Sequence, residues 1–151
     1  MDMNILVSAC LIGLPTRYSG DGKHVDWIEH LAAAHTLIPV CPEQLGGLPT
    51  PRTPCERRGE RVVDRDGMDR TQAFSDGAEW ALRAAQLNSC RCAILKQRSP
   101  SCGSGTIYDG SFSGRLTVGD GMAAARLKQA GIRVFSEEDE ADCLAWLRDQ
   151  R

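Results

Sequence analysis

The chain has 151 residues, a formal net charge of −2 and seven cysteines. This length suits a single domain, residues 1–151, with a core that needs no disulfide for stability. The slightly acidic balance disfavours nucleic acid as a partner, because attraction to phosphates dominates such binding. The sequence lacks a signal-peptide pattern and any apolar run of membrane-spanning length. We therefore expect a cytoplasmic protein, in which clustered cysteines more often bind metal or catalyse reactions than form cross-links.

The first part of the chain predicts two buried strands with a helix between them. Residues 4–8 form a short apolar run that is followed by a turn at Gly13, as expected of a buried strand. Residues 26–35 have the length and alanine content of a helix. Residues 37–40 are a second apolar run, which stops before Pro42.

A short strand at residues 61–63 and a longer helix follow. Residues 71–87 carry apolar side chains at helical spacing, among them Phe74 and Leu82, so this helix should cover one face of the sheet. Residues 92–95 are a third buried strand, and a loop rich in turn-forming residues comes after it.

The last part of the chain repeats the alternation. Asp120 is expected to cap a helix that ends at Ala130, with Gly131 just beyond it, and residues 132–135 are a fourth strand. Ser136 and the acidic residues after it resemble a capping box at the start of the final helix. Strands that alternate with helices predict a three-layer α/β/α domain with a mostly parallel, Rossmann-like sheet.

Three of the seven cysteines, Cys10, Cys41 and Cys102, each follow a predicted strand. A parallel sheet gathers the carboxyl ends of its strands along one edge, and ligand sites form there. We therefore expect these three thiols to converge into a metal site.

The positions of the other four cysteines set them apart. Cys90 and Cys92 lie at the opposite end of the third strand, and Cys143 lies in the final helix, where small buried side chains are expected. Cys55 stands in a proline-rich segment after Cys41, close enough in sequence to reach the site. It is the leading candidate for a fourth ligand.

Soft thiolates select zinc, copper(I) or iron–sulfur clusters, and a 4Fe-4S cluster normally takes four cysteines. Three cysteines leave one iron open, and an open iron acts as a Lewis acid toward a soft substrate atom. Two alternatives stay open: a zinc hydrolase with three cysteine ligands and a water, and an electron-transfer or binding module in which Cys55 completes the cluster. A metal-free thiol enzyme ranks last, because no cysteine has an obvious histidine partner.

Four further residues are candidates for catalysis or substrate binding. Glu43 lies two positions after Cys41, where a carboxylate could move protons or activate water. Ser101 directly precedes Cys102 and offers a hydroxyl to a substrate. Tyr108 and Phe112 lie in a glycine-rich loop where a flat ring could stack, and this loop has neither the dinucleotide-binding nor the P-loop spacing.

Several segments together carry a resemblance to a known family. They are residues 7–13 (VSACLIG), 39–43 (PVCPE), 46–52 (GGLPTPR), 61–67 (RVVDRDG), 95–103 (LKQRSPSCG) and 108–114 (YDGSFSG). In this combination, and over nearly the whole chain, the sequence resembles the thiouracil desulfidase family, long catalogued as a domain of unknown function.

The resemblance implies a 4Fe-4S cluster on Cys10, Cys41 and Cys102, the same thiols that the strand ends indicate. It also implies desulfurisation of a small thiopyrimidine without net redox change: 2-thiouracil or 4-thiouracil and water give uracil and hydrogen sulfide. In that reaction Glu43 would serve as general base and acid, and Ser101 would orient the reacting groups.

Overall fold

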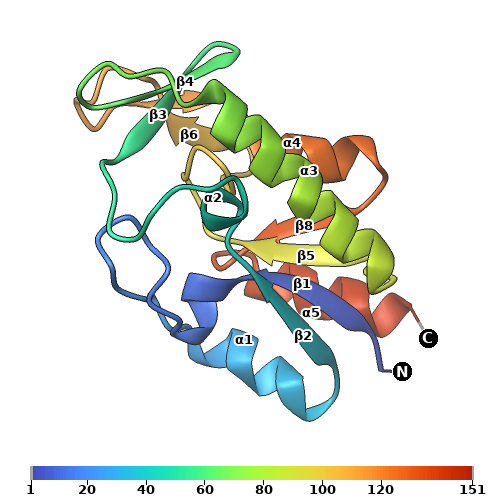
Figure 1. Cartoon of the computed structure of the whole chain (residues 1–151). Helices are drawn as coiled ribbons and strands as arrows, with labels where there is room; N and C mark the ends of the chain where they lie inside the picture. The colour runs from blue at the N-terminus through green and yellow to red at the C-terminus, as the bar shows by residue number, and fades with distance from the viewer. Residues whose placement is uncertain (1, 151) are drawn as a thin grey trace.

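The computed structural model describes residues 2–150 and has a four-stranded sheet at its centre (Figure 1). In spatial order the strands are β2 (Thr36–Val40), β1 (Asn4–Ser8), β5 (Cys92–Leu95) and β8 (Arg133–Ser136). Every neighbouring pair is parallel. The predicted α/β class and parallel sheet are confirmed, and each predicted strand lies within one residue of an observed one.

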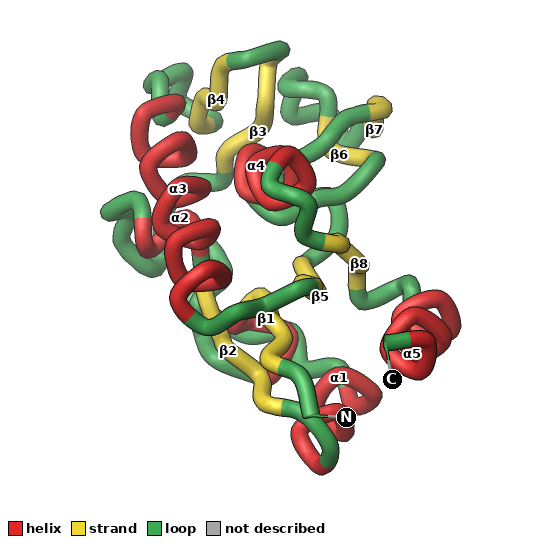
Figure 2. The backbone as a smooth tube through the Cα atoms, turned by 90° about the vertical axis from the view of Figure 1, so that its right-hand side faces the viewer, coloured by secondary structure: helices red, strands yellow, loops and turns green. Residues whose placement is uncertain are grey.

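Helices cover both faces of the sheet (Figure 2). On one face lie α3 (Thr71–Leu87) and α4 (Met122–Gln129), and on the other lie α1 (Asp26–His30) and α5 (Glu140–Asp149). Successive β1 side chains point to opposite faces, so Ile5 packs in the cluster that contains α1 and α5 residues, and Leu6 packs with α3 and α4 residues. The three-layer arrangement is therefore confirmed.

Shorter elements fill the connections. They are the 3₁₀ helices η1 (Ala9–Ile12) and η2 (Leu31–Ala33), the helix α2 (Pro42–Leu45), and two antiparallel hairpins, β3 (Cys55–Arg58) with β4 (Arg61–Asp64) and β6 (Thr106–Tyr108) with β7 (Leu116–Val118). Of these shorter elements, the sequence predicted only β4. The others were missed because elements this short carry little hydrophobic periodicity. Within residues 2–150, no helix combines the length and apolarity needed to cross a membrane.

The direction of strand addition reverses between β1 and β5. From β1 the chain moves to β2 on one side and later to β5 on the other. In open α/β sheets such a reversal, at the carboxyl ends of the strands, is where ligands bind. The fold thus marks the ends of β1 and β5 as the place to look for a site.

The first helix is shorter than predicted. The expected helix over residues 26–35 is α-helical only to His30 and continues as the tighter η2. Just after η2, His35 Nδ1 accepts the backbone N–H of Met3 at 3.1 Å. The chain is then already aligned beside β1, and β2 begins at the next residue.

Asp120 does not cap α4 as predicted. The helix begins at Met122, after Gly121 at the cap position. The Asp120 carboxylate instead accepts the Gly105 N–H at 2.8 Å and pairs with Lys128 at 2.9 Å. These two partners satisfy the side chain away from the helix terminus.

Ser136 makes one of the two hydrogen bonds of a capping box, and the final helix starts later than predicted. The Ser136 N–H donates to the Asp139 carboxylate at 2.8 Å, and its hydroxyl accepts the Glu138 N–H at 3.1 Å. A turn occupies these residues, and α5 begins at Glu140.

Two glycines bring α2 and α3 into direct backbone contact. A methyl group on Gly46 would overlap the Ala73 carbonyl, and one on Gly77 would overlap the Pro42 carbonyl. No side chain can stand between the two helices at this crossing. The position of α2, and of the residues it carries, therefore depends on these glycines.

Gly77→Ala tests this contact. Alanine favours a helix interior by about 1 kcal/mol over glycine, but the overlap with the Pro42 carbonyl is a clash with backbone and should outweigh that gain. We expect a net loss of roughly 1–3 kcal/mol in the free energy of unfolding, measured with urea. Gln86→Ala, on the exposed side of α3, is the control. Unchanged or higher stability in Gly77→Ala would contradict the contact.

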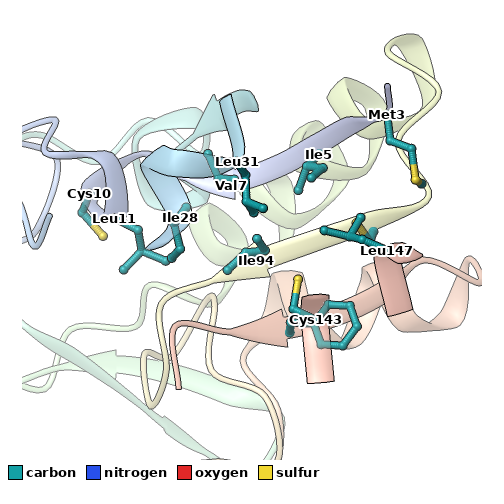
Figure 3. Packing of buried hydrophobic residues seen from close by; sticks show 12 residues of the cluster. Met3, Ile5, Val7, Cys10, Leu11, Ile28, Leu31, Ile94, Cys143 and Leu147 are labelled. Atoms are coloured by element: carbon teal, nitrogen blue, oxygen red, sulfur yellow. The ribbon is translucent and has the colours of Figure 1, made fainter. Parts of the chain in front are cut away.

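The cysteines expected in the core are buried there. Cys90, Cys92 and Cys143 belong to the two apolar clusters that flank the sheet. Figure 3 shows Cys143 packed close to Ile94, whereas Cys10 lies at the far end of the same cluster. Burial raises the pKa of Cys143 from 9.0 to about 12, and burial does the same for Cys92.

This burial predicts a loss of stability in alkali. The folded protein keeps the Cys143 proton up to a pKa of about 12, whereas an unfolded chain releases it near pH 9.0. The stabilisation is complete below about pH 9 and declines toward pH 12, by about 1.4 kcal/mol per pH unit for each such thiol. Cys143→Ala should therefore show a shallower decline in urea unfolding experiments. Val134→Ala, a core truncation without a titrating group, should keep the wild-type slope, and an unchanged slope in Cys143→Ala would contradict the argument.

Candidate functional site

The three cysteines predicted as ligands lie along one edge of the sheet. Cys10 lies in η1 directly after β1, Cys41 precedes α2 directly after β2, and Cys102 lies in the loop after β5. Because β2, β1 and β5 are neighbours and run in the same direction, their carboxyl ends lie side by side. The structure therefore brings these loops together where the direction of strand addition reverses.

Neighbouring thiols contribute to the raised pKa values of Cys10 and Cys102. Burial raises the pKa of Cys10 to about 11, and the Cys41 thiol adds to the rise. Burial raises the pKa of Cys102 to about 12, with smaller contributions from Cys41 and Cys10. The thiolate is the form that binds metal, so a metal ion or cluster would have to displace protons that Cys10 and Cys102 hold at neutral pH.

Hydroxyl groups flank Cys102. Ser8 Oγ donates to Cys102 Sγ at 3.3 Å, and Ser101 Oγ lies 3.5 Å from the same sulfur. Ser8 Oγ in turn accepts the Lys96 N–H at 2.9 Å, which joins the ends of β1 and β5. Both hydroxyls lower the pKa of Cys102 against the effect of burial. The Ser8 hydroxyl would stabilise the Cys102 thiolate once a cation is bound, whereas Ser101 has a single hydroxyl proton, which the closer Glu43 oxygen accepts.

Two sets of hydrogen bonds fix the loop that carries Cys102. Ser99 Oγ accepts the N–H groups of Ser101 at 3.1 Å and of Cys102 at 2.9 Å. The N–H groups of Ala123 and Ala124, in the first turn of α4, donate to the Ser101 carbonyl oxygen at 2.8 and 3.1 Å. The amino-terminal end of α4 therefore holds the loop in place through its backbone.

Glu43 and Ser101, the two residues predicted to be catalytic, are in direct contact. Ser101 Oγ donates to Glu43 Oε2 at 3.0 Å, and Arg52 Nε donates to the opposite oxygen, Oε1, at 2.9 Å. Ser101 is 2% exposed, and the side chains of Arg52 and Glu43 are 6% and 13% exposed. Glu43 reaches this position because α2 begins directly after β2. Residues 58 positions apart thus form one buried network beside the cysteine loops.

Basic side chains lie near Cys10. Lys96 and Arg17 both lower the pKa of its thiol, although burial outweighs them. The Lys96 ammonium also pairs with Glu137 at 3.0 Å, a residue in the turn before α5. The pair links the loop after β5 to the loop after β8.

Cys55 lies near Glu43. Burial raises the pKa of its thiol to about 12, and the carboxylates of Glu43 and Asp64 add to the rise. The thiol donates to the Thr53 carbonyl oxygen at 3.6 Å. Cys55 is the first residue of β3 and not part of an irregular loop as predicted. Its part as a fourth ligand stays a prediction.

Tyr108 and Phe112 lie on the hairpins. Tyr108 ends β6 and pairs with Leu116 of β7. Phe112 follows in the connecting loop with a φ of 56°, a strained conformation for an aromatic residue. Glu56 of β3 accepts its N–H at 3.1 Å, and the Arg65 guanidinium lies 6.0 Å from its ring. The structure brings neither residue into the Glu43–Ser101 network, and their part in substrate binding stays a prediction.

The donor set fits an iron–sulfur cluster by its chemistry. Cys10, Cys41 and Cys102 are soft sulfur donors on three adjacent loops, and they lie within electrostatic reach of one another. Among residues 2–150, no three His, Cys, Asp or Glu side chains lie close enough to hold a single metal ion. A cluster binds each thiolate through a separate iron.

The fold and the site define an α/β protein with three converging thiols beside a buried carboxylate–hydroxyl pair. A sequence model of the 2-thiouracil desulfurase family matches residues 5–139, and the chain belongs to that family of enzymes. The resemblance noted in the sequence is therefore confirmed.

Two relatives are similar over almost the whole chain. The uncharacterized protein YbbK of Bacillus subtilis (strain 168) is 42% identical over an aligned length of 150, and the match covers 93% of this chain and 99% of that protein. A solved structure of the 4Fe-4S-dependent thiouracil desulfidase TudS is 45% identical, with a TM-score of 0.90. The similarity to TudS covers 99% of this chain and 100% of the other.

Two residues of the network were missed in the sequence, Ser8 and Arg52. Ser8 closes an apolar strand, and nothing in its neighbourhood marks its hydroxyl as a partner of a sulfur 94 positions away. Arg52 ends the segment GGLPTPR, one of those that carry the family resemblance. The only feature of the sequence that could have indicated Arg52 is a single charged residue at the end of a stretch rich in glycine and proline.

Proposed function

We propose that this protein removes sulfur from thiolated uracil without net redox change, so that 2-thiouracil or 4-thiouracil and water give uracil and hydrogen sulfide. The family match and the 45% identity to a 4Fe-4S-dependent thiouracil desulfidase support this reaction class. In this structure the 3.0 Å hydrogen bond between Ser101 and Glu43 supports the proposal, because it lies beside the cysteine loops, where a proton acceptor would be needed.

Cys10, Cys41 and Cys102 would hold a 4Fe-4S cluster. They are soft donors on neighbouring loops, and hydroxyl groups adjoin the Cys102 sulfur. With three protein ligands, a bound cluster would have one iron free of protein, and that iron would act as a Lewis acid toward the thiocarbonyl sulfur of the substrate. The remaining chemistry falls to the side chains around it.

Glu43 would act as general base and then as general acid. Its Oε2 accepts one hydrogen bond from Ser101 and has a further lone pair for a water proton. Its Oε1 is bound by Arg52, so the carboxylate keeps one orientation. The proton taken up at Oε2 would then pass to the ring nitrogen or to the departing sulfur.

Ser101 would orient the reacting groups. Its buried hydroxyl lies 3.0 Å from Glu43 Oε2 and 3.5 Å from Cys102 Sγ. It therefore stands between the general base and one of the cluster ligands, where it can align the attacking water with the substrate. Tyr108 and Phe112 are the candidates for stacking on the flat pyrimidine ring.

We further propose that residues 1–151 act as one domain in the cytoplasm.

Anaerobic reconstitution and cysteine substitution test the proposal. We expect about four irons per chain, and release of sulfide and uracil when thiouracil is added. Cys10→Ala, Cys41→Ala and Cys102→Ala should each lose the cluster, whereas Cys143→Ala should keep it. Iron and sulfide analysis, absorption and electron paramagnetic resonance spectra measure the outcome.

Other outcomes would overturn different parts of this proposal. Intact clusters in all three ligand variants would refute the ligand set. Zinc in place of iron would refute the cofactor, and an intact cluster without turnover of either thiouracil would refute the substrate.

Glu43→Gln separates cofactor binding from proton transfer. Glutamine has nearly the same shape but cannot take up a water proton at this position, so the cluster should remain while kcat falls by roughly 10²- to 10⁴-fold. Glu79→Gln, which changes an exposed carboxylate paired with Arg126, is the control and should keep wild-type kcat. Full turnover in Glu43→Gln would show that another group moves the proton.

A further inference from the structure

All five N–H donors of the Arg52 guanidinium have partners. Nε donates to Glu43 Oε1 at 2.9 Å, Nη1 to the Pro49 carbonyl at 3.2 Å and Thr50 Oγ1 at 2.9 Å, and Nη2 to the Thr16 carbonyl at 2.9 Å and Cys41 Sγ at 3.8 Å. With every donor engaged and only 6% of the side chain exposed, the guanidinium has one orientation.

These contacts join loops that leave different strands. Thr16 belongs to the segment after β1, whereas Cys41 and Glu43 follow β2. The Arg52 backbone strengthens the connection, because its N–H donates to the Tyr18 carbonyl at 2.8 Å. One side chain thus fixes a carboxylate, a thiol and the neighbouring loop relative to one another.

We propose that Arg52 is a positioning residue that holds the Glu43 carboxylate against the Ser101 hydroxyl. The inference rests on the proposed role of Glu43. Because Nε binds Oε1, the carboxylate cannot rotate, and Oε2 stays directed at the Ser101 hydroxyl. Arg52 acts through Glu43 and does not itself take part in proton transfer.

Lysine is the substitution that tests geometry apart from charge. A lysine ammonium has three donors at one point, whereas the guanidinium spreads five across a rigid plane. Lysine at this position can pair with Glu43, but it cannot also bind the Thr16 carbonyl and the Cys41 sulfur from the arginine's position. Arg52→Lys therefore keeps the positive charge and removes the fixed arrangement.

We expect Arg52→Lys to retain its iron content and the electron paramagnetic resonance spectrum of its cluster. KM for thiouracil should stay within about twofold of wild type, while kcat falls by about 10²-fold, the order of loss that follows from a misplaced catalytic group. Arg61→Lys is the matched control, because Arg61 also binds a carboxylate, that of Asp69, but on an exposed hairpin. Arg61→Lys should leave the iron content, the spectrum, KM and kcat unchanged.

A double-mutant cycle separates positioning from general support of the fold. When Glu43 is already glutamine there is no general base to position, so adding Arg52→Lys should lower the residual kcat by no more than about twofold. An arginine that merely supports the loops would lower kcat by the same factor in both backgrounds. Equal factors would therefore overturn the proposal, as would wild-type kcat in Arg52→Lys or loss of its cluster.

Crystal structures of the wild type and Arg52→Lys make the test independent of turnover. The variant should show Glu43 Oε2 displaced from the Ser101 hydroxyl, and an unchanged 3.0 Å contact would overturn the positioning role. If the wild type with its cluster fails to convert thiouracil, the proposed function fails, while the displacement still decides the role of Arg52 toward Glu43.

Discussion

Parallel pairing of β1 with both β2 and β5 is the constraint on which the site depends. Val7 pairs with Pro39 on one side and with Ile94 on the other, so the three strands end nearly level. The loops after them must leave from the same edge. An antiparallel neighbour would send its following loop to the opposite edge and remove a cysteine from the group.

Burial strengthens the ion pair between Glu43 and Arg52 beside the cysteine loops. The Glu43–Arg52 pair is largely shielded from water, and a buried ion pair that loses one partner leaves an uncompensated charge, at a cost of roughly 3–5 kcal/mol. Within residues 2–150, no buried side-chain nitrogen or oxygen lacks a hydrogen-bond partner. The carboxylate is therefore held beside the Ser101 hydroxyl, and the short helix α2 keeps it there because glycines let α2 rest directly on α3.

The sequence predicted the features that follow from local pattern and strand direction. The four sheet strands are apolar runs, α3 has a long apolar stripe, and Cys10, Cys41 and Cys102 owe their position to the strands before them.

Features that depend on partners distant in sequence were missed or misplaced. Asp120 binds Lys128 and Gly105 instead of capping α4. The contacts of Ser8 and Arg52 become visible only when the ends of β1, β2 and β5 are assembled.

The raised pKa values of Cys10 and Cys102 indicate how this site can fold before it is loaded. Thiolates at the buried Cys10 and Cys102 would repel each other in a medium of low dielectric constant if no cation were bound, but protonated thiols carry no charge. The chain can therefore assemble these loops while the sulfurs of Cys10 and Cys102 are neutral. The Glu43 carboxylate beside them is paired with Arg52. Binding of the cluster would then exchange protons for iron, and the hydroxyls of Ser8 and Ser101 already lie next to the Cys102 sulfur that receives the charge.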